Sequence, residues 1–93
     1  MGFLAGLAYS NKTASGAVKS APGIFCGAVL TGGSDAATLI VYDNTAGSGT
    51  VVLKLAAAAG VSVSIVLPEG VACNKGMYAA LTGTAPSASV FYG

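Results

Sequence analysis

The residues of this chain that could carry out chemistry are few and widely spaced. Three carboxylates, four lysines and two cysteines occur in 93 residues, and there is no histidine. Without histidine a serine–histidine–aspartate triad cannot form, and two distant cysteines cannot supply the four ligands of a zinc site. We therefore expect no catalytic, cofactor-binding or metal-binding residues, and we do not expect an enzyme.

The three acids, Asp35, Asp43 and Glu69, all fall in predicted turns. Carboxylates in turns commonly accept hydrogen bonds from backbone amides. We expect this structural role rather than paired acid–base work. Residues 46–50, "AGSGT", contain glycine but lack the Gly-Lys pair and the following helix of a phosphate-binding loop.

The two cysteines, Cys26 and Cys73, are far apart in the sequence. Free cysteine is among the most buried residue types, and thiols stay reduced in the cytoplasm. We expect two small buried hydrophobic residues. A disulfide remains open, and it requires that the two strands be neighbours.

The charge content excludes several classes of partner. Charged residues make up 8% of the chain, against about 25% in an ordinary globular protein. The net charge of +1 gives no cluster of cations for nucleic acid. So few charges leave much of the surface uncharged, which indicates an assembly in which that surface faces other protein.

No segment predicts a membrane span. Residues 51–67 are apolar, but they contain Lys54 and read as two strands broken near Gly60. Residues 1–12 lack the positively charged start of a signal peptide. We expect no membrane partner.

The pattern from residue 17 onward is that of β-strands. Apolar residues alternate with small or polar ones, and clusters of Gly, Asp, Asn, Ser and Pro separate the runs. Seven or eight short antiparallel strands predict an all-β sandwich or barrel. The clearest strands are expected at 23–31, 36–42, 50–55, 61–67, 76–82 and 87–92.

The alternation also predicts which side chains face inward. Residues 61–67 alternate most clearly and are expected to end at the Pro-Glu-Gly that follows. In residues 23–31, Ile24 is expected to share a face with Leu30, whereas Lys54 should point outward from its strand. The expected core residues are Leu39, Val41, Leu53, Val63, Ile65, Leu67, Leu81 and Phe91.

Residues 38–42, "TLIVY", are apolar on both faces of the expected strand. One face is needed for the core. The other, with Ile40 and Tyr42, must be covered by a loop, a second sheet or a neighbouring subunit. This favours a homo-oligomer, with a trimer expected before a dimer.

The first 16 residues differ from the rest and are expected to form an N-terminal arm, with the β-domain spanning 17–93. The arm combines large apolar side chains with Lys12 as its one charge. Such a segment would be poorly soluble when exposed, so we expect it to dock on a partner. The candidate contact residues are Phe3, Leu4, Leu7 and Tyr9.

Two longer stretches carry a resemblance. They are residues 39–55, "LIVYDNTAGSGTVVLKL", and residues 67–92, "LPEGVACNKGMYAALTGTAPSASVFY". Their order of a Tyr-Asp-Asn-Thr turn, a Val/Leu strand, Pro-x-Gly-Val and a Leu-Thr-Gly-Thr hairpin resembles small structural proteins of tailed bacteriophages. The resemblance covers about residues 23–93.

The resemblance implies a compact, jelly-roll-like antiparallel β-sandwich in the virion, assembled in the host cytoplasm. Its implied function is that of a capsid decoration (cement) protein that stabilises the head shell, often as a trimer, on the major capsid protein or another virion protein. The same fold also serves in tail and fibre parts. A tail or fibre module that binds the host surface is therefore the alternative, and copy number in particles would distinguish the two.

Overall fold

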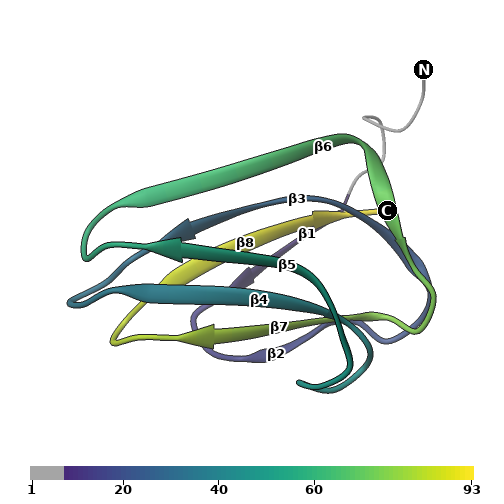
Figure 1. Cartoon of the computed structure of the whole chain (residues 1–93), viewed down its shortest axis with the longest axis horizontal. Coiled ribbons are helices and arrows are strands. Elements are labelled where there is room, and N and C mark those ends of the chain that lie inside the picture. Colours follow the sequence, from purple (N-terminus) through teal and green to yellow (C-terminus); the bar gives the residue numbers. More distant parts are fainter. Residues whose placement is uncertain (1–7) are drawn as a thin grey trace.

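The computed structural model of this protein describes residues 8–93, and these form eight β-strands and no helix (Figure 1). The all-β prediction is confirmed. The strands are β1 (Ala8–Lys12), β2 (Gly16–Lys19), β3 (Gly23–Thr31), β4 (Ala37–Asp43), β5 (Thr50–Ala57), β6 (Ser62–Cys73), β7 (Met77–Thr82) and β8 (Ser87–Tyr92).

The strands form two antiparallel four-stranded sheets. Sheet A has the order β1-β8-β3-β6, and sheet B has the order β2-β7-β4-β5. In Figure 1 β6 of sheet A lies at the top and β7 and β2 of sheet B lie at the bottom, while β8 and β5 overlap in the middle of the view. Only β4 and β5 are consecutive in sequence and paired in one sheet. Every other connection between the eight strands passes from one sheet to the other.

One hydrophobic cluster draws side chains from both sheets. Leu39, Val41 and Leu81 are buried in it, as the alternation predicts. Removing large aliphatic side chains from water supplies the main favourable free energy of folding. The buried members of the cluster are Phe25, Ala28, Leu30, Ala37, Leu39, Val41, Ala57, Cys73, Met77, Ala79, Leu81, Ala88 and Val90.

The prediction that Phe91 of β8 lies in the core is wrong. Phe91 is 37% exposed, and its neighbour Val90 is fully buried. Phe91 pairs with Gly27 on one side and with Tyr9 on the other, so it lies on the face of sheet A that turns away from the core. Since both residues are apolar, the strand could present either one to the core.

The edge strands bury their predicted core residues only in part. Leu53 of β5 is half-buried, and so is Ile65 of β6. Each of these strands has a hydrogen-bonded neighbour on one side only, so the side chains are open to water beyond that edge. Among the four predicted core residues of these strands, the three that still pack on the core are Leu53, Val63 and Leu67.

An irregularity in β3 changes its facing pattern. Phe25 pairs with Val71 and Gly27 with Val66, so the single residue between them opposes the four residues 67–70 of β6. This β-bulge shifts the alternation. Phe25 becomes a core residue and Ile24 is 40% exposed, so the prediction that Ile24 and Leu30 share a face is wrong.

Strand β6 is longer than predicted. It continues through Pro68 and Glu69 to Cys73 instead of ending at the Pro-Glu-Gly sequence. Figure 1 shows it bending sharply near the N-terminal part of β3. Gly70 has φ +74° in this bend, a conformation that side-chain-bearing residues rarely adopt. Edge strands tolerate proline because one row of their backbone groups has no partner in the sheet.

The N-terminal segment differs from the expected arm. Ala8–Lys12 form β1 and pair with β8, and β2 begins at Gly16 and pairs with β7. Strand β1 hydrogen-bonds to backbone groups of β8 that would otherwise form a sheet edge. Three of the predicted contact residues, Phe3, Leu4 and Leu7, lie outside the described residues.

Candidate functional site

Two of the three acids bind backbone amides of turns, as predicted. Asp35 Oδ1 accepts a hydrogen bond from the Thr84 amide at 2.6 Å. Asp43 Oδ1 accepts one from the Lys75 amide at 2.9 Å. The amide of Lys75, followed by that of Asn74, lowers the pKa of the Asp43 carboxyl below its ordinary value. Both carboxylates join loops that are distant in the sequence.

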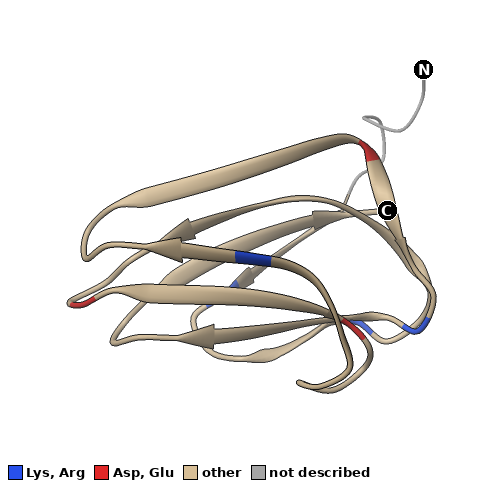
Figure 2. Cartoon of the chain, in the orientation of Figure 1, with Lys and Arg blue, Asp and Glu red and all other residues tan. Residues whose placement is uncertain are grey.

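The lysines are spread over the molecule. Lys12 Nζ donates to the Ala17 carbonyl at 2.8 Å, and Lys19 Nζ donates to the Gly93 carbonyl at 3.2 Å. Lys54 is exposed on β5, the edge strand of sheet B, as predicted. A charge on an edge strand disfavours pairing with another chain. Figure 2 shows most of the other charged residues of the described chain near strand ends and turns, and Glu69 at the bend within β6.

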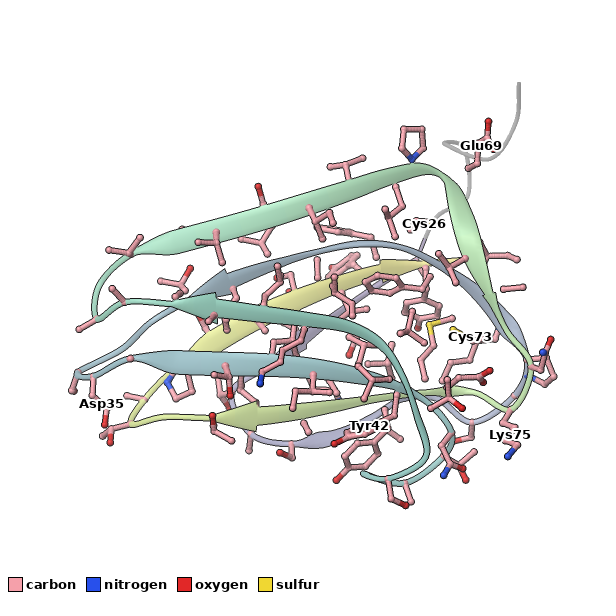
Figure 3. The ribbon with its side chains drawn as sticks, viewed as in Figure 1. Cys26, Asp35, Tyr42, Glu69, Cys73 and Lys75 are labelled. Carbon is pink, nitrogen blue, oxygen red and sulfur yellow. The ribbon has the colours of Figure 1, made fainter. Side chains whose placement is uncertain are left out.

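The two cysteines are free and buried, as expected. Cys73 lies in the core opposite Gly23, whereas Cys26 lies in the irregular part of β3 (Figure 3). Burial raises the pKa of the Cys73 thiol, and the negative charge of Asp43 adds to this shift. A buried thiol with a raised pKa is a poor nucleophile.

The described residues bring no reactive groups together. None of their His, Cys, Asp and Glu side chains form a group of three that could hold a metal ion. No polar or charged residue among them is fully buried. Nor do residues 8–93 contain a helix long and apolar enough to cross a membrane. The features left to consider as a site are surfaces.

The most distinctive surface is the outer face of sheet A, meaning the side chains of its strands that point away from sheet B. In the strand segments that end at the bend of β6, register and alternation place eleven residues on this face. None of them is charged, and the nearest charged residue of β6 is Glu69, at the bend itself. The eleven residues are Tyr9, Asn11, Gly27, Val29, Thr31, Ser62, Ser64, Val66, Ser87, Ser89 and Phe91.

One row across this face is apolar. Tyr9 pairs with Phe91, Phe91 with Gly27, and Gly27 with Val66, so the row crosses all four strands from β1 to β6. Tyr9 is 67% exposed and Val66 is 72% exposed. Phe91 is 37% exposed, whereas Gly27 is buried between its neighbours. Exposed apolar residues are ordinary when single, but here three of them are aligned by the register. We call these four residues the apolar row.

The rest of the outer face carries mainly hydroxyl and amide groups. Ser89 Oγ donates to Asn11 Oδ1 at 2.6 Å across β8 and β1. Thr31 and Ser62 share a hydroxyl–hydroxyl hydrogen bond of 2.8 Å across β3 and β6. These pairs satisfy one another, and their side chains are short. The face is therefore uncharged and built largely from small residues.

A shallow open hollow of about 310 Å³ lies at the bend of β6. It is lined by Leu67, Pro68, Glu69 and Gly70. Figure 3 shows Glu69 projecting at the outside of the bend. Its lining residues come directly after Val66 in the chain, so the hollow adjoins the end of the apolar row. Its single carboxylate gives it no set of converging polar groups.

The outer face of sheet B is partly covered by its own loop. A Cβ on Gly47, in the loop between β4 and β5, would lie 3.1 Å from a ring carbon of Tyr78. Tyr78 pairs with Tyr42 on this face, and both Tyr42 and Ile40 are half-buried. The loop thus reaches Tyr78, the neighbour of Tyr42 on this face, while the cover expected for Ile40 and Tyr42 stays a prediction.

No protein-family model, no curated protein and no solved structure matches this chain.

The sequence signal for the apolar row was weak. Val66 stands next to Ile65 in an apolar run, so alternation alone marks either residue as inward. Tyr9 was named as a contact residue, but as part of an arm rather than of a sheet. Pairing between β1, β8, β3 and β6 joins residues far apart in the chain. No local pattern in the sequence contains that pairing.

Proposed function

We propose that this protein is a non-enzymatic structural subunit of a tailed-bacteriophage virion, most specifically a capsid decoration (cement) protein that stabilises the head shell. The observation that carries the proposal is the uncharged outer face of sheet A with its apolar row. A surface of this kind is typical of a contact with other protein. The resemblance of residues 23–93 to phage structural proteins supplies the biological setting.

The composition supports this proposal. The chain has seven ionisable acids and lysines among 93 residues, and most of those in the structure serve turns or strand ends. A subunit packed among other proteins needs fewer surface charges than a free domain does. The partners proposed are further copies of this chain and the major capsid protein or another virion protein, with the assembly formed in the host cytoplasm.

The finer fold assignment is also a proposal. We assign the eight strands to a jelly-roll-like sandwich, because the chain crosses between two four-stranded sheets at every connection except β4–β5. Double-sheet jelly rolls have eight strands and serve in viral shells. The sheet orders β1-β8-β3-β6 and β2-β7-β4-β5 support the assignment.

The proposed partner contacts start from the N-terminal segment. Tyr9 lies on β1 at one end of the apolar row. Phe3, Leu4 and Leu7 lie outside the described residues, and they remain the proposed contact residues beyond the sheet. The proposed contact with the shell is made by this segment, which leaves the outer face of sheet A for a contact with further protein of the assembly.

A module of the tail or fibre that binds the host surface is the second candidate. The observation that favours it is the pair of exposed aromatic residues, Tyr9 and Phe91, side by side on adjacent strands. Aromatic faces are common in surfaces that bind other molecules. The two candidates differ in abundance, since a shell carries many more copies than a tail does.

The test is quantitative mass spectrometry of purified particles together with binding to particles stripped of this protein. The decoration proposal expects hundreds of copies per particle, saturable rebinding to stripped heads, and heads that break at lower temperature without it. A few copies to tens of copies at the tail supports the second candidate. Absence from purified particles contradicts both.

A further inference from the structure

We propose that the outer face of sheet A is a self-association surface, on which a second copy of this chain stacks the same face through a two-fold axis. This proposal rests on the structural role proposed above. It deepens that role by naming one contact of the assembly, the one between two copies of this chain. It also favours a pair of subunits over the trimer that the resemblance implies.

The charge pattern favours a second copy as the occupant. In a two-fold contact the same patch meets itself, so any net charge on the patch would repel its own copy. The eleven outer-face residues carry none. A strongly charged partner would meet no opposite charge there, and removing its charges from water would be unfavourable.

The edges of the sheets are poor alternatives to this face. β5 carries the charged Lys54, and β6 bends at Pro68 and Glu69. Edge charges, proline and bends all disfavour pairing with a strand of another chain. β1 has five residues and ends at Lys12, and β2 has four residues and an irregular register. Stacking of faces therefore remains more favourable than edge-to-edge extension of a sheet.

The sizes along the apolar row suggest the direction of the axis. Tyr9 and Phe91 are large and occupy β1 and β8, whereas Gly27 and Val66 are small and occupy β3 and β6. A two-fold axis parallel to the strands, between β8 and β3, places the large half of one row over the small half of the other. An axis along the row would stack each residue on its own copy and leave a gap at Gly27.

The size of the face indicates a modest affinity. Four strands about 4.8 Å apart and the five residue positions of about 3.3 Å each that the outer-face residues span give a face of about 300 Å². Two such faces bury about 600 Å², which is less than a stable specific interface buries. The apolar row lies at one end of this face, and the serine, threonine and asparagine side chains extend from it in one direction along the strands. We therefore expect a weak pair that forms only at about a hundred micromolar or above.

The test is sedimentation equilibrium of the full chain from low micromolar to several hundred micromolar. We expect a monomer–dimer equilibrium for the natural protein. Val66→Lys should weaken dimerisation at least about tenfold, because it places an unpaired charge against Tyr9 of the other copy. Val51→Lys is the matched control, since Val51 is 52% exposed but lies on β5 of sheet B; it should dimerise as the natural protein does.

A charge-pair experiment tests the proposed axis. Tyr9→Glu alone should weaken dimerisation, as Val66→Lys does. The double variant should regain much of the affinity, because position 9 of one copy meets position 66 of the other. Within one chain these positions lie on opposite edges of sheet A, so the recovery cannot come from an internal ion pair. Far-UV circular dichroism confirms that each variant is folded.

Several outcomes would overturn the inference. A natural protein that stays monomeric at several hundred micromolar, a trimer, or equal effects of Val66→Lys and Val51→Lys each contradict it. If removing residues 2–7 turns a monomer into a self-associating protein, the chain's own first residues cover the face instead. A monomer that still saturates stripped heads would refute the pairing and leave the proposed function standing.

Discussion

Asp35 and Thr84, 49 residues apart, are joined by two hydrogen bonds: Asp35 Oδ1 accepts from the Thr84 amide at 2.6 Å and Oδ2 accepts from the Thr84 hydroxyl at 3.0 Å. The carboxylate connects the turn between β3 and β4 to the turn between β7 and β8. These turns lie at one end of the molecule. Each belongs to a connection that crosses between sheet A and sheet B. A single surface acid therefore helps to hold the two sheets in register.

The first prediction concerns this pair. Asp35→Ala should lower the free energy of unfolding by about 1 kcal/mol, a typical net value for a surface hydrogen bond to a charged group. Thr84→Val removes the hydroxyl and keeps the amide, so its effect should be smaller. Urea denaturation of both single variants and the double variant measures their coupling. Additive effects would mean that the hydroxyl contributes nothing through Asp35.

The second prediction concerns pH. The amides of Lys75 and Asn74 lower the pKa of Asp43 below its usual value of 3.8. Because the folded pKa is depressed, this stabilisation is present above the unfolded pKa and is lost as the pH falls through the folded pKa. The urea concentration at the midpoint of unfolding of the natural protein should therefore decrease when the pH is lowered below about 4.

The control for that prediction is Asp43→Asn, which keeps an acceptor oxygen for the Lys75 amide and removes the titration. Its urea midpoint should depend less on pH in the same range. If the two proteins lose stability in parallel on acidification, another group is responsible. Comparing complete curves from neutral to acidic pH removes the constant difference between the two proteins.

The third prediction separates the true core from the expected one. Leu39 is fully buried between the sheets, so Leu39→Ala should cost about 2–5 kcal/mol. Phe91 is 37% exposed on the outer face, and Phe91→Ala should cost clearly less. Leu53→Ala should fall between them, since Leu53 is half-buried. Equal losses for Leu39→Ala and Phe91→Ala would contradict the observed facing of β8.

The fourth prediction uses two glycines with similar backbone angles. Gly60 has φ +69° with open space around it, and Gly70 has φ +74°. A Cβ on Gly70 would overlap Cγ2 of Ile24. Both alanine substitutions should cost about 1–2 kcal/mol for the left-handed backbone, and Gly70→Ala should cost more because Ile24 must also move. Thermal unfolding of the two variants gives the difference directly, and equal costs would show that the bend of β6 relaxes freely.

Much of the local structure followed from the sequence. The strand predicted at 23–31 matches β3 and the strand predicted at 87–92 matches β8. Lys54 points outward, and Asp35 and Asp43 bind turn amides. The strand positions and the outward direction of Lys54 depend on neighbours a few residues away, where apolar alternation and turn-forming residues act directly on the backbone. For the two acids the sequence predicted the role alone, since the amides that Asp35 and Asp43 bind belong to Thr84 and Lys75, which are distant in the chain.

Other features were decided only by tertiary structure. Alternation could not choose between Val90 and Phe91, because both are apolar and only pairing with Gly27 and Tyr9 assigns Phe91 to the outside. Strand β1 was missed because its partner, β8, is at the other end of the chain. The apolar row across sheet A has the same origin. Its members are brought together by hydrogen bonds between distant strands, and the free energy of that pairing is a property of the whole fold rather than of any one segment.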